Sequence, residues 1–241
     1  MNAEGALTGR AAVVTGASRG IGLAVSRALA GAGARVVMLA RSRADLDRHA
    51  AEIGRDAVAI ACDITDETAL SIAATKTHAA LGRAPDILVN NAGTFTLGTV
   101  DQMSVDEFER TITVNLIAPF GLIRTFLPDM RARGAGHIVT VGSIADRMAF
   151  PENGAYAASK FGLRGLHEVM RAELRGSGVR ATLVSPGPVD TSLWDPVALE
   201  TRPEFTPRSA MLTPDLVADA ILYVVTRPPA VNVDELRLSR S

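Results

Sequence analysis

A tyrosine and a lysine four residues apart are the first residues in this sequence whose spacing suits chemistry. Tyr156 and Lys160 lie in a helical pattern, where residues i and i+4 share a face. A neighbouring ammonium favours the phenolate, so we expect Lys160 to lower the pKa of Tyr156 from its ordinary value near 10. Such a phenol can exchange a proton with a substrate oxygen. Ser143, upstream, offers a hydroxyl to the same oxygen.

Taken alone, each of these residues also has an ordinary structural explanation. A tyrosine and lysine at this spacing commonly form a pair on an exposed helix surface. A serine after a strand is usually a cap or turn residue. The context in the chain therefore decides between chemistry and structure.

A glycine-rich turn near the start of the chain gives that context. It reads Thr15-Gly16-Ala17-Ser18-Arg19-Gly20-Ile21-Gly22 and joins an apolar run to a helical pattern. Glycine allows a positive φ or a close backbone approach to a ligand, and the N–H groups of a following helix suit a pyrophosphate. A plain tight turn is the alternative. A P-loop is excluded because no Gly-Lys-Ser/Thr follows.

Apolar runs alternate with helical patterns along the whole chain. The runs are nearly continuous, which is typical of strands covered on both faces, and the alternation indicates parallel βαβ units. We expect an α/β fold with a single doubly wound parallel sheet, a Rossmann fold, and helices on both faces. Ligands of such sheets bind beyond the carboxyl ends of the strands. The expected strands are 11–14, 36–39, 58–61, 87–89, 138–141 and 179–184, and the expected helices 20–29, 42–53, 66–80, 104–130, 155–175 and 216–225.

Length and composition limit the class of protein. The 241 residues, 47% apolar and 21% charged, predict one globular domain over residues 1–241. A net charge of −1 without a basic block argues against nucleic-acid binding. The single cysteine, Cys62, excludes a disulfide within the chain, and no apolar run approaches the roughly 20 residues of a bilayer span. We therefore expect a cytoplasmic protein that binds no membrane. The four histidines show no metal-ligand spacing, so no metal site is expected.

Six motifs in register resemble the short-chain dehydrogenase/reductase family. They are the pattern Thr-Gly-x-x-x-Gly-x-Gly, the run Asn90-Asn91-Ala92-Gly93 after the fourth strand, Asn115, Ser143, Tyr156-x-x-x-Lys160, and Pro186-Gly187 after the sixth strand. The resemblance runs from about residue 7 to residue 191. It implies an enzyme that moves a hydride between a nicotinamide cofactor and a carbonyl/alcohol pair.

The resemblance also implies a role for individual residues. Tyr156 would transfer the substrate proton, Lys160 would lower its pKa and hold the nicotinamide ribose, Ser143 would orient the carbonyl, and Asn115 would hold a water linked to Lys160. Asp63 would bond the adenine, although it can equally cap the helix expected from about residue 66. The positions that would bind cofactor are Gly16, Ser18, Arg19, Gly20, Ile21, Gly22, Arg41, Asp63, Ile64, Asn91, Ala92, Gly93, Tyr156, Lys160, Pro186, Val189 and Thr191.

The end of the second strand predicts which nicotinamide is used. An acidic residue there would bond the ribose 2′-hydroxyl and repel a 2′-phosphate. The sequence instead has Arg41, which can pair with a phosphate, and Arg19 in the glycine turn can reach the same group. We predict NADP(H). The alternative is that Arg41 and Arg43 are solvated residues at the start of a helix.

The substrate is less constrained. The stretch from Pro186 to Pro214 is expected to form a substrate loop, about 187–213, that closes over the pocket. The residues Met148, Phe150, Trp194 and Phe205 are candidates for an apolar lining, with ordinary packing as the alternative. His167 and Glu168 are expected at the surface or at a subunit contact, and Cys62 in the core.

Several functions remain open at this point. The C-terminal stretch 231–238 resembles members that act on small hydroxy acids or aldehydes, and the missing Gly-Gly pair argues against a 3-oxoacyl-thioester reductase. A non-catalytic NADP-binding sensor or scaffold is an alternative, and a sugar-nucleotide epimerase or dehydratase another. By resemblance we expect a homo-oligomer, a tetramer or dimer, whose contacts use the helices 104–130 and 155–175.

Overall fold

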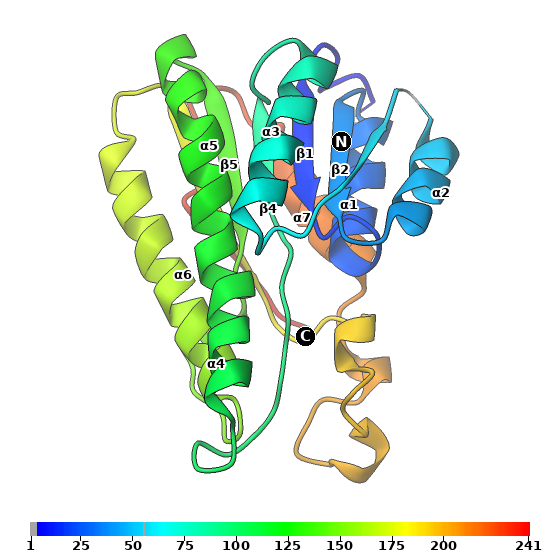
Figure 1. The fold of residues 1–241 in the computed structure, drawn as a ribbon, viewed down its shortest axis with the longest axis vertical. Coiled ribbons are helices and arrows are strands. Elements are labelled where there is room, and N and C mark those ends of the chain that lie inside the picture. The colour runs from blue at the N-terminus through cyan, green and yellow to red at the C-terminus, as the bar shows by residue number, and fades with distance from the viewer. Residues whose placement is uncertain (1–3, 55) are drawn as a thin grey trace.

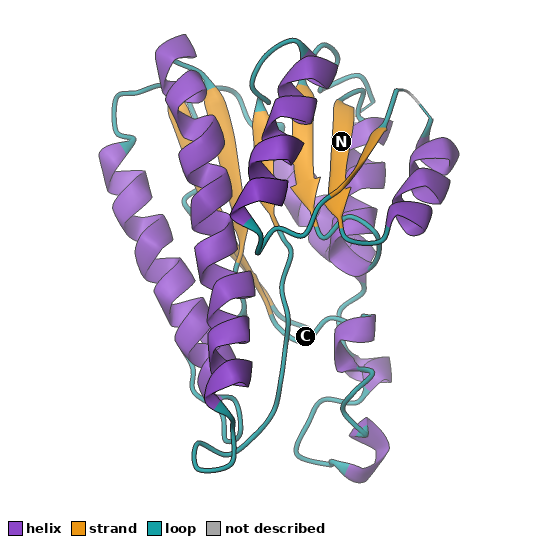
Figure 2. Ribbon diagram, viewed as in Figure 1, coloured by secondary structure: helices purple, strands orange, loops and turns teal. Residues whose placement is uncertain are grey.

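The computed structural model describes residues 4–54 and 56–241, and within them the chain forms one sheet of seven parallel strands (Figures 1 and 2). The strand order is β3-β2-β1-β4-β5-β6-β7, and every neighbouring pair is parallel. The predicted doubly wound sheet is therefore confirmed. The strands are β1 (Ala11–Thr15), β2 (Arg35–Ala40), β3 (Val58–Ala61), β4 (Ile87–Asn90), β5 (Gly136–Val141), β6 (Val179–Pro186) and β7 (Glu235–Leu238).

Helices cover both faces of the sheet (Figure 2). One face packs against α1 (Gly20–Gly31), α2 (Arg43–Ile53) and α7 (Pro214–Val225). The other face packs against α3 (Glu67–Leu81), α5 (Ala118–Arg133) and α6 (Gly154–Glu173), and α4 (Val105–Ile112) leads into α5. The core is thus two apolar layers separated by the sheet.

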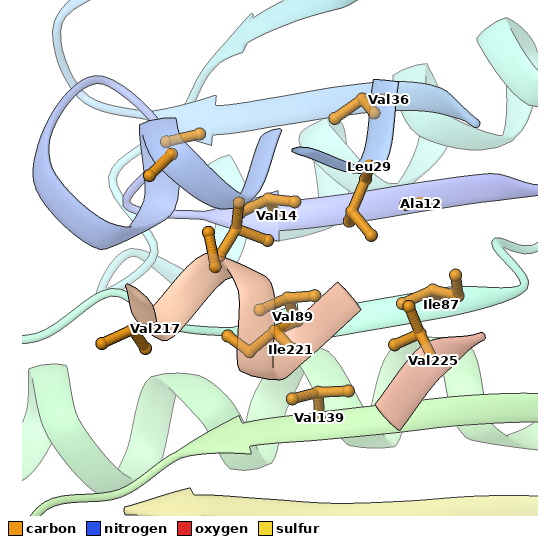
Figure 3. Close-up of a cluster of buried hydrophobic side chains, with 14 of the residues drawn as sticks. Ala12, Val14, Leu29, Val36, Ile87, Val89, Val139, Val217, Ile221 and Val225 are labelled. Atoms are coloured by element: carbon orange, nitrogen blue, oxygen red, sulfur yellow. The ribbon is translucent and has the colours of Figure 1, made fainter. Parts of the chain in front are cut away.

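The strands read as continuous apolar runs because both of their faces are buried. In β1, Val14 belongs to the layer under α1 and α7, whereas Val13 belongs to the opposite layer. Figure 3 shows the first layer, in which Val217 and Ile221 of α7 lie over the valines of neighbouring strands. An alternating pattern would leave one of these layers polar.

Short polar signals set several helix starts as predicted. Ser104 and Glu107 form a reciprocal capping box at α4. Thr213 accepts from Leu216 N at 3.4 Å where α7 begins. Asp66 caps α3 by accepting from the N–H groups of residues 68 and 69. The alternative that Asp63 caps this helix is therefore wrong.

The helix predicted over 104–130 is interrupted. Between α4 and α5 the backbone makes a π-helical turn over Thr113–Ile117, which contains the buried Asn115. Such turns insert one extra residue and frequently occur at functional sites. The continuous stretch Val105–Arg133 also contains an 18-residue window with a mean hydropathy of 1.3, long and apolar enough to cross a membrane, which the sequence analysis did not predict. Its apolar residues Leu122 and Phe126 pack against the sheet, so the fold accounts for them.

Two segments follow the predicted sixth strand. The loop 187–213, called the lid loop below, contains three short 3-10 turns and lies apart from the sheet, in gold in Figure 1. Its two ends are joined, because Leu212 N donates to Pro188 O at 2.9 Å. The chain then returns through α7 to β7, an edge strand that the sequence analysis did not predict. Gly187 N donates to Leu238 O at 2.8 Å, so β7 also fixes the start of the lid loop.

Candidate active site

The strand order reverses between β1 and β4, which opens a crevice at their carboxyl ends. Thr15, the last residue of β1, closes the bottom of this crevice. Its hydroxyl accepts from Asn91 N and from Ala92 N, each at 3.0 Å, and donates to Val89 O at 3.3 Å. Asn91 Nδ2 donates back to Thr15 O at 2.9 Å. The glycine turn and the segment after β4 are thus held as one floor.

The three glycines of the turn have different tasks. Gly16 and Gly20 have φ angles of +65° and +53°, which favour glycine. Gly22 has an ordinary φ, but a Cβ there would lie 2.3 Å from Gly16 O, so only glycine allows this packing. Behind the turn, α1 begins at Gly20 with no acidic residue in its first turn. The positive end of α1 therefore faces the crevice.

One cavity of about 940 Å³ extends from the glycine turn to the lid loop. It brings together residues that are far apart in the sequence, as predicted. Gly22 and Asn115 are not in its lining, since Gly22 packs beneath the turn and Asn115 is buried behind the wall. The predicted residues that line it are Gly16, Ser18, Arg19, Gly20, Ile21, Arg41, Asp63, Ile64, Asn91, Ala92, Gly93, Ser143, Tyr156, Lys160, Pro186, Val189 and Thr191.

Two arginines lie at the end of the cavity near α1. Arg19 and Arg41 are exposed and line this end, next to the glycine turn. Asp45 also lines it, and hydrogen bonds from Ser42 and Arg48 occupy its carboxylate. Asp63 accepts from Thr65 N and Thr65 Oγ1, and these bonds lower its pKa, with Arg41 contributing. The two arginines and the helix end thus form an anion-binding region.

The other end of the cavity carries the tyrosine and lysine of α6. Lys160 is 4% exposed, and its ammonium donates to Val141 O, at the end of β5, at 2.9 Å. The same ammonium lies 5.6 Å from the centre of the Tyr156 ring. Ser143 lies two residues after the end of β5 and lines the same wall. The end of one strand and the first turns of one helix therefore position all three groups.

Burial has the dominant effect on the pKa values of these groups. It raises the pKa of Tyr156, which the hydrogen bond with Ser143 opposes and the nearby Asp146 reinforces. Burial also lowers the pKa of Lys160 to about 8, against the effect of Asp146. Lys160 does not contribute to the shift of the Tyr156 pKa, so the expectation that it lowers the pKa of Tyr156 is wrong for this structure, in which desolvation of the phenol dominates. The phenol is protonated at neutral pH.

Asn115 braces α6 rather than facing the cavity. Its Oδ1 accepts from Thr94 N at 2.8 Å, and its Nδ2 donates to Thr94 O at 2.9 Å and to Ser159 Oγ at 3.0 Å. Ser159 in turn donates to Tyr156 O at 2.7 Å. Both amide hydrogens of Asn115 are thus used within the protein, and the water expected between it and Lys160 stays a prediction.

A buried carboxylate that the sequence analysis missed lies behind Ser143. Asp146 has no exposed surface and accepts from Ser143 N at 3.3 Å, from Arg147 Nε at 2.9 Å, and from the hydroxyl of Ser185 on β6. Arg147 continues to Glu235 on β7. This network connects the backbone of Ser143 to two strands. Its only sequence signal is an acidic residue three positions after Ser143.

Aromatic and charged side chains together line the pocket beside Tyr156. Phe150, Trp194 and Phe205 line the pocket, as predicted for an apolar lining. Met148 does not line it and is 45% exposed. Phe95, from the segment after β4, completes the lining and was not predicted. The charged residues Glu152, Arg202 and Glu204, also missed, line the same region.

Two further predictions concern residues outside the cavity wall. His167 is 2% exposed and its Nδ1 lies 3.1 Å from Thr140 Oγ1, so the expectation of a surface or contact residue is wrong. It faces the sheet because it lies seven residues after Lys160, on the same side of α6. Cys62 is buried as predicted, and burial raises the pKa of its thiol to about 11.

The chain is similar in sequence to proteins of one known family. Residues 10–201 match the family described as short chain dehydrogenase. The chain is 34% identical to D-threitol dehydrogenase of Mycolicibacterium smegmatis over 232 residues, 93% of this chain and 89% of that protein. It is 36% identical to glycine betaine reductase ATRR of Emericella nidulans over 241 residues, 97% of this chain but only 19% of that much longer protein.

A solved structure shares both fold and length. A metagenomic short-chain oxidoreductase in complex with NADP superposes with a TM-score of 0.84 at 38% identity, covering 98% of this chain and 99% of that one. The seven-stranded arrangement therefore occurs in an oxidoreductase of the same size.

Proposed function

Because the chain belongs to the short-chain dehydrogenase/reductase family, we propose that this oxidoreductase uses NADP(H) to interconvert a carbonyl and an alcohol. One observation carries the proposal. Ser143, Tyr156 and Lys160 line the same cavity as the glycine turn and the two exposed arginines. A dinucleotide along this cavity would reach from the arginines to the phenol.

The cofactor, when bound, supplies the hydride. The chain supplies proton and positioning. Tyr156 carries a proton at neutral pH because burial raises its pKa, so it can donate to the oxygen of a carbonyl as negative charge develops there. Ser143 would hold that oxygen through its hydroxyl. Lys160, anchored on Val141, would orient the ribose end of the nicotinamide.

NADP(H) rather than NAD(H) is supported by charge. The carboxyl end of β2 carries Arg41 in place of an acid, and Arg19 lies across the same opening. Both can form charge-assisted bonds to a 2′-phosphate. The solved relative that is 38% identical to this chain is a complex with NADP, which supports the same cofactor here by similarity.

The test is to follow NADPH and NADH consumption with a panel of aldehydes, ketones and 3-keto acids. We expect turnover with a higher kcat/KM for NADPH. The chain offers a matched control, since Tyr223 is its second tyrosine and is exposed on α7. Tyr156→Phe should abolish turnover while NADPH binding persists, and Tyr223→Phe should leave it intact. Tight NADPH binding by the wild type without any turnover would instead identify a sensor.

Assembly and location are also proposals. Large apolar side chains are exposed on both α5 (Phe120) and α6 (Phe161 and Val169), and exposed apolar surface is often covered by another subunit. We propose that α5 and α6 join copies of the chain into a dimer or tetramer, which light scattering would show. The buried, unpaired Cys62 suits a reducing cytoplasm.

A further inference from the structure

An aromatic wall leads away from the phenol of Tyr156. It consists of Phe95, Trp194 and Phe205. The ring of Phe95 meets that of Tyr156 edge-on at 5.0 Å between centroids, Trp194 lies 5.0 Å from Phe95, and Phe205 lies 5.9 Å from Trp194. All three rings line the cavity. Aromatic faces bind apolar groups, and they also bind cations through the ring quadrupole.

A cation already lies at the end of this wall. The guanidinium of Arg202 is 4.9 Å from the ring centre of Phe205. Arg202 also donates to Glu152 Oε2 at 2.8 Å and to Glu204. Two carboxylates thus face one guanidinium, which leaves this part of the pocket with a net charge of −1. An anionic substrate group would be repelled here and a cationic one attracted.

The position of Glu152 is held by the fold. Its φ of +62° is uncommon for a residue with a side chain, and its carbonyl accepts from Gly98 N at 2.9 Å. Backbone strain of this kind persists only where surrounding structure imposes it, and it gathers at ligand sites. The strained residue is four positions before Tyr156, so it carries a carboxylate to the pocket at the start of the catalytic helix.

The lid loop as a whole also carries more acidic than basic residues. Arg208 bonds to both Asp190, at 2.8 Å, and Asp195, at 2.7 Å. Over residues 187–213 the sequence has four acidic residues and two arginines. Asp190, Asp195 and Arg208 lie outside the cavity lining, so the charge that a bound substrate meets directly is that of Glu152, Arg202 and Glu204.

Resting on the proposed function, we propose that the pocket selects carbonyl substrates that carry a quaternary ammonium group on a short spacer. The ammonium lies against Trp194 and near Glu152, and the carbonyl reaches Ser143 and Tyr156. In the reaction the hydride of NADPH adds to the carbonyl carbon and the phenolic proton adds to its oxygen, giving the alcohol and NADP⁺. The charge of the ammonium is unchanged throughout.

The test compares three aldehydes at saturating NADPH. Trimethylammonioacetaldehyde is cationic, 3,3-dimethylbutanal is its neutral isostere, and 4-oxobutanoate is anionic. We expect kcat/KM for the cation to exceed that for the isostere by about tenfold or more, as a ring face and a carboxylate together would give. The preference should weaken as salt is added. Each preference is a ratio within one enzyme preparation, so loss of folded protein cancels.

Three variants locate the preference. Glu152→Gln and Trp194→Leu should each lower the ratio of cation to isostere severalfold. Glu200→Gln removes the same charge from the lid loop at an exposed residue outside the cavity lining, so it should keep the wild-type ratio.

Different results would overturn different statements. Equal rates for the cation and its isostere, or a preference for 4-oxobutanoate through Arg202, would overturn the ammonium site and leave carbonyl reduction standing. If neither these aldehydes nor the wider panel consumed NADPH, the proposed function itself would fail.

Discussion

The ammonium of Lys160 donates to the carbonyl oxygen of Val141 at 2.9 Å, across the junction between α6 and the end of β5. The lysine is almost fully buried, and burial lowers its pKa to about 8. A charge kept inside the protein in this way opposes folding. The site therefore carries a stability cost that mutation can reveal.

Lys160→Met should stabilise the protein at pH 7 while it removes activity. Between pH 8 and the ordinary lysine pKa of 10.5, the unfolded chain holds a proton that the folded chain has lost. Below pH 8 the buried charge destabilises the folded wild type by its full amount, about 3 kcal/mol. The variant avoids this penalty but loses the hydrogen bond to Val141, which is worth about 1 kcal/mol. Urea unfolding should show a difference of about 2 kcal/mol at pH 7 that shrinks toward pH 10. A variant less stable than wild type at pH 7 would contradict this.

Asp146→Asn should shift the pH profile of alcohol oxidation. Burial raises the pKa of Tyr156, and the negative charge of Asp146 raises it further. Alcohol oxidation needs Tyr156 as a base, so its pKa sets the acidic limb of kcat/KM, and removing the charge of Asp146 should move that limb to lower pH. The asparagine NH2 cannot accept, so either Ser143 N or Arg147 Nε loses its acceptor, which should also lower kcat, about tenfold. If Asp146 had only a structural role, its substitution would lower kcat without moving the pH profile. That outcome would refute its electrostatic effect on Tyr156.

Two buried histidines should make the protein sensitive to acid. Burial lowers the pKa of His137 to about 3, with Arg180, Arg10 and His167 contributing. It lowers that of His167 to about 4, with Arg171 contributing and Asp234 opposing. The folded chain keeps both neutral below pH 6.5, where the unfolded chain binds protons. Stability is thus complete above pH 6.5 and falls toward pH 4.

The expected size is roughly 2 kcal/mol per histidine at pH 5. Thermal unfolding between pH 4.5 and 7.5 measures it. His167→Gln should flatten the dependence by about half. An unchanged slope in the His167 variant would show that other groups cause the acid sensitivity.

Arg41→Asp should reverse the cofactor preference. The substitution removes a phosphate partner and places a carboxylate where it can bond a ribose hydroxyl. We expect the ratio of kcat/KM for NADPH to that for NADH to fall about 10- to 100-fold. Arg43→Asp is the control, since Arg43 pairs with Asp47 and lies outside the cavity lining. Equal effects of the two substitutions would indicate a general charge effect.

The parts of the fold that the sequence predicts are those with strong local patterns. The strands buried on both faces, such as Ala11–Thr15, are continuous apolar runs, and the capped helix starts at Ser104 and Thr213 have specific hydrogen-bond signals. The edge strand Glu235–Leu238 was missed because it is short, half-exposed and carries charges. Its place depends on pairing with β6, which no local pattern encodes.

The candidate site shows the same division. Residues in ordered motifs, such as Tyr156 and Lys160, were found from spacing. Glu152, Arg202 and Phe95 were not, because the lid loop alone brings them together across about 50 to 100 residues of sequence. The π-helical turn at Asn115 and the buried face of His167 depend in turn on how the helices pack onto the sheet.

Following the transferred hydride gives the most direct test of NADPH-dependent carbonyl reduction with Tyr156 as the proton donor. NADPH carrying deuterium at its transferable C4 position is incubated with the enzyme and the best carbonyl from the panel, and the product alcohol is examined by NMR and mass spectrometry. We expect one deuterium on the carbinol carbon with the wild type and Tyr223→Phe, and no labelled alcohol with Tyr156→Phe. Alcohol without deuterium, or labelled alcohol formed as fast by Tyr156→Phe, would contradict it.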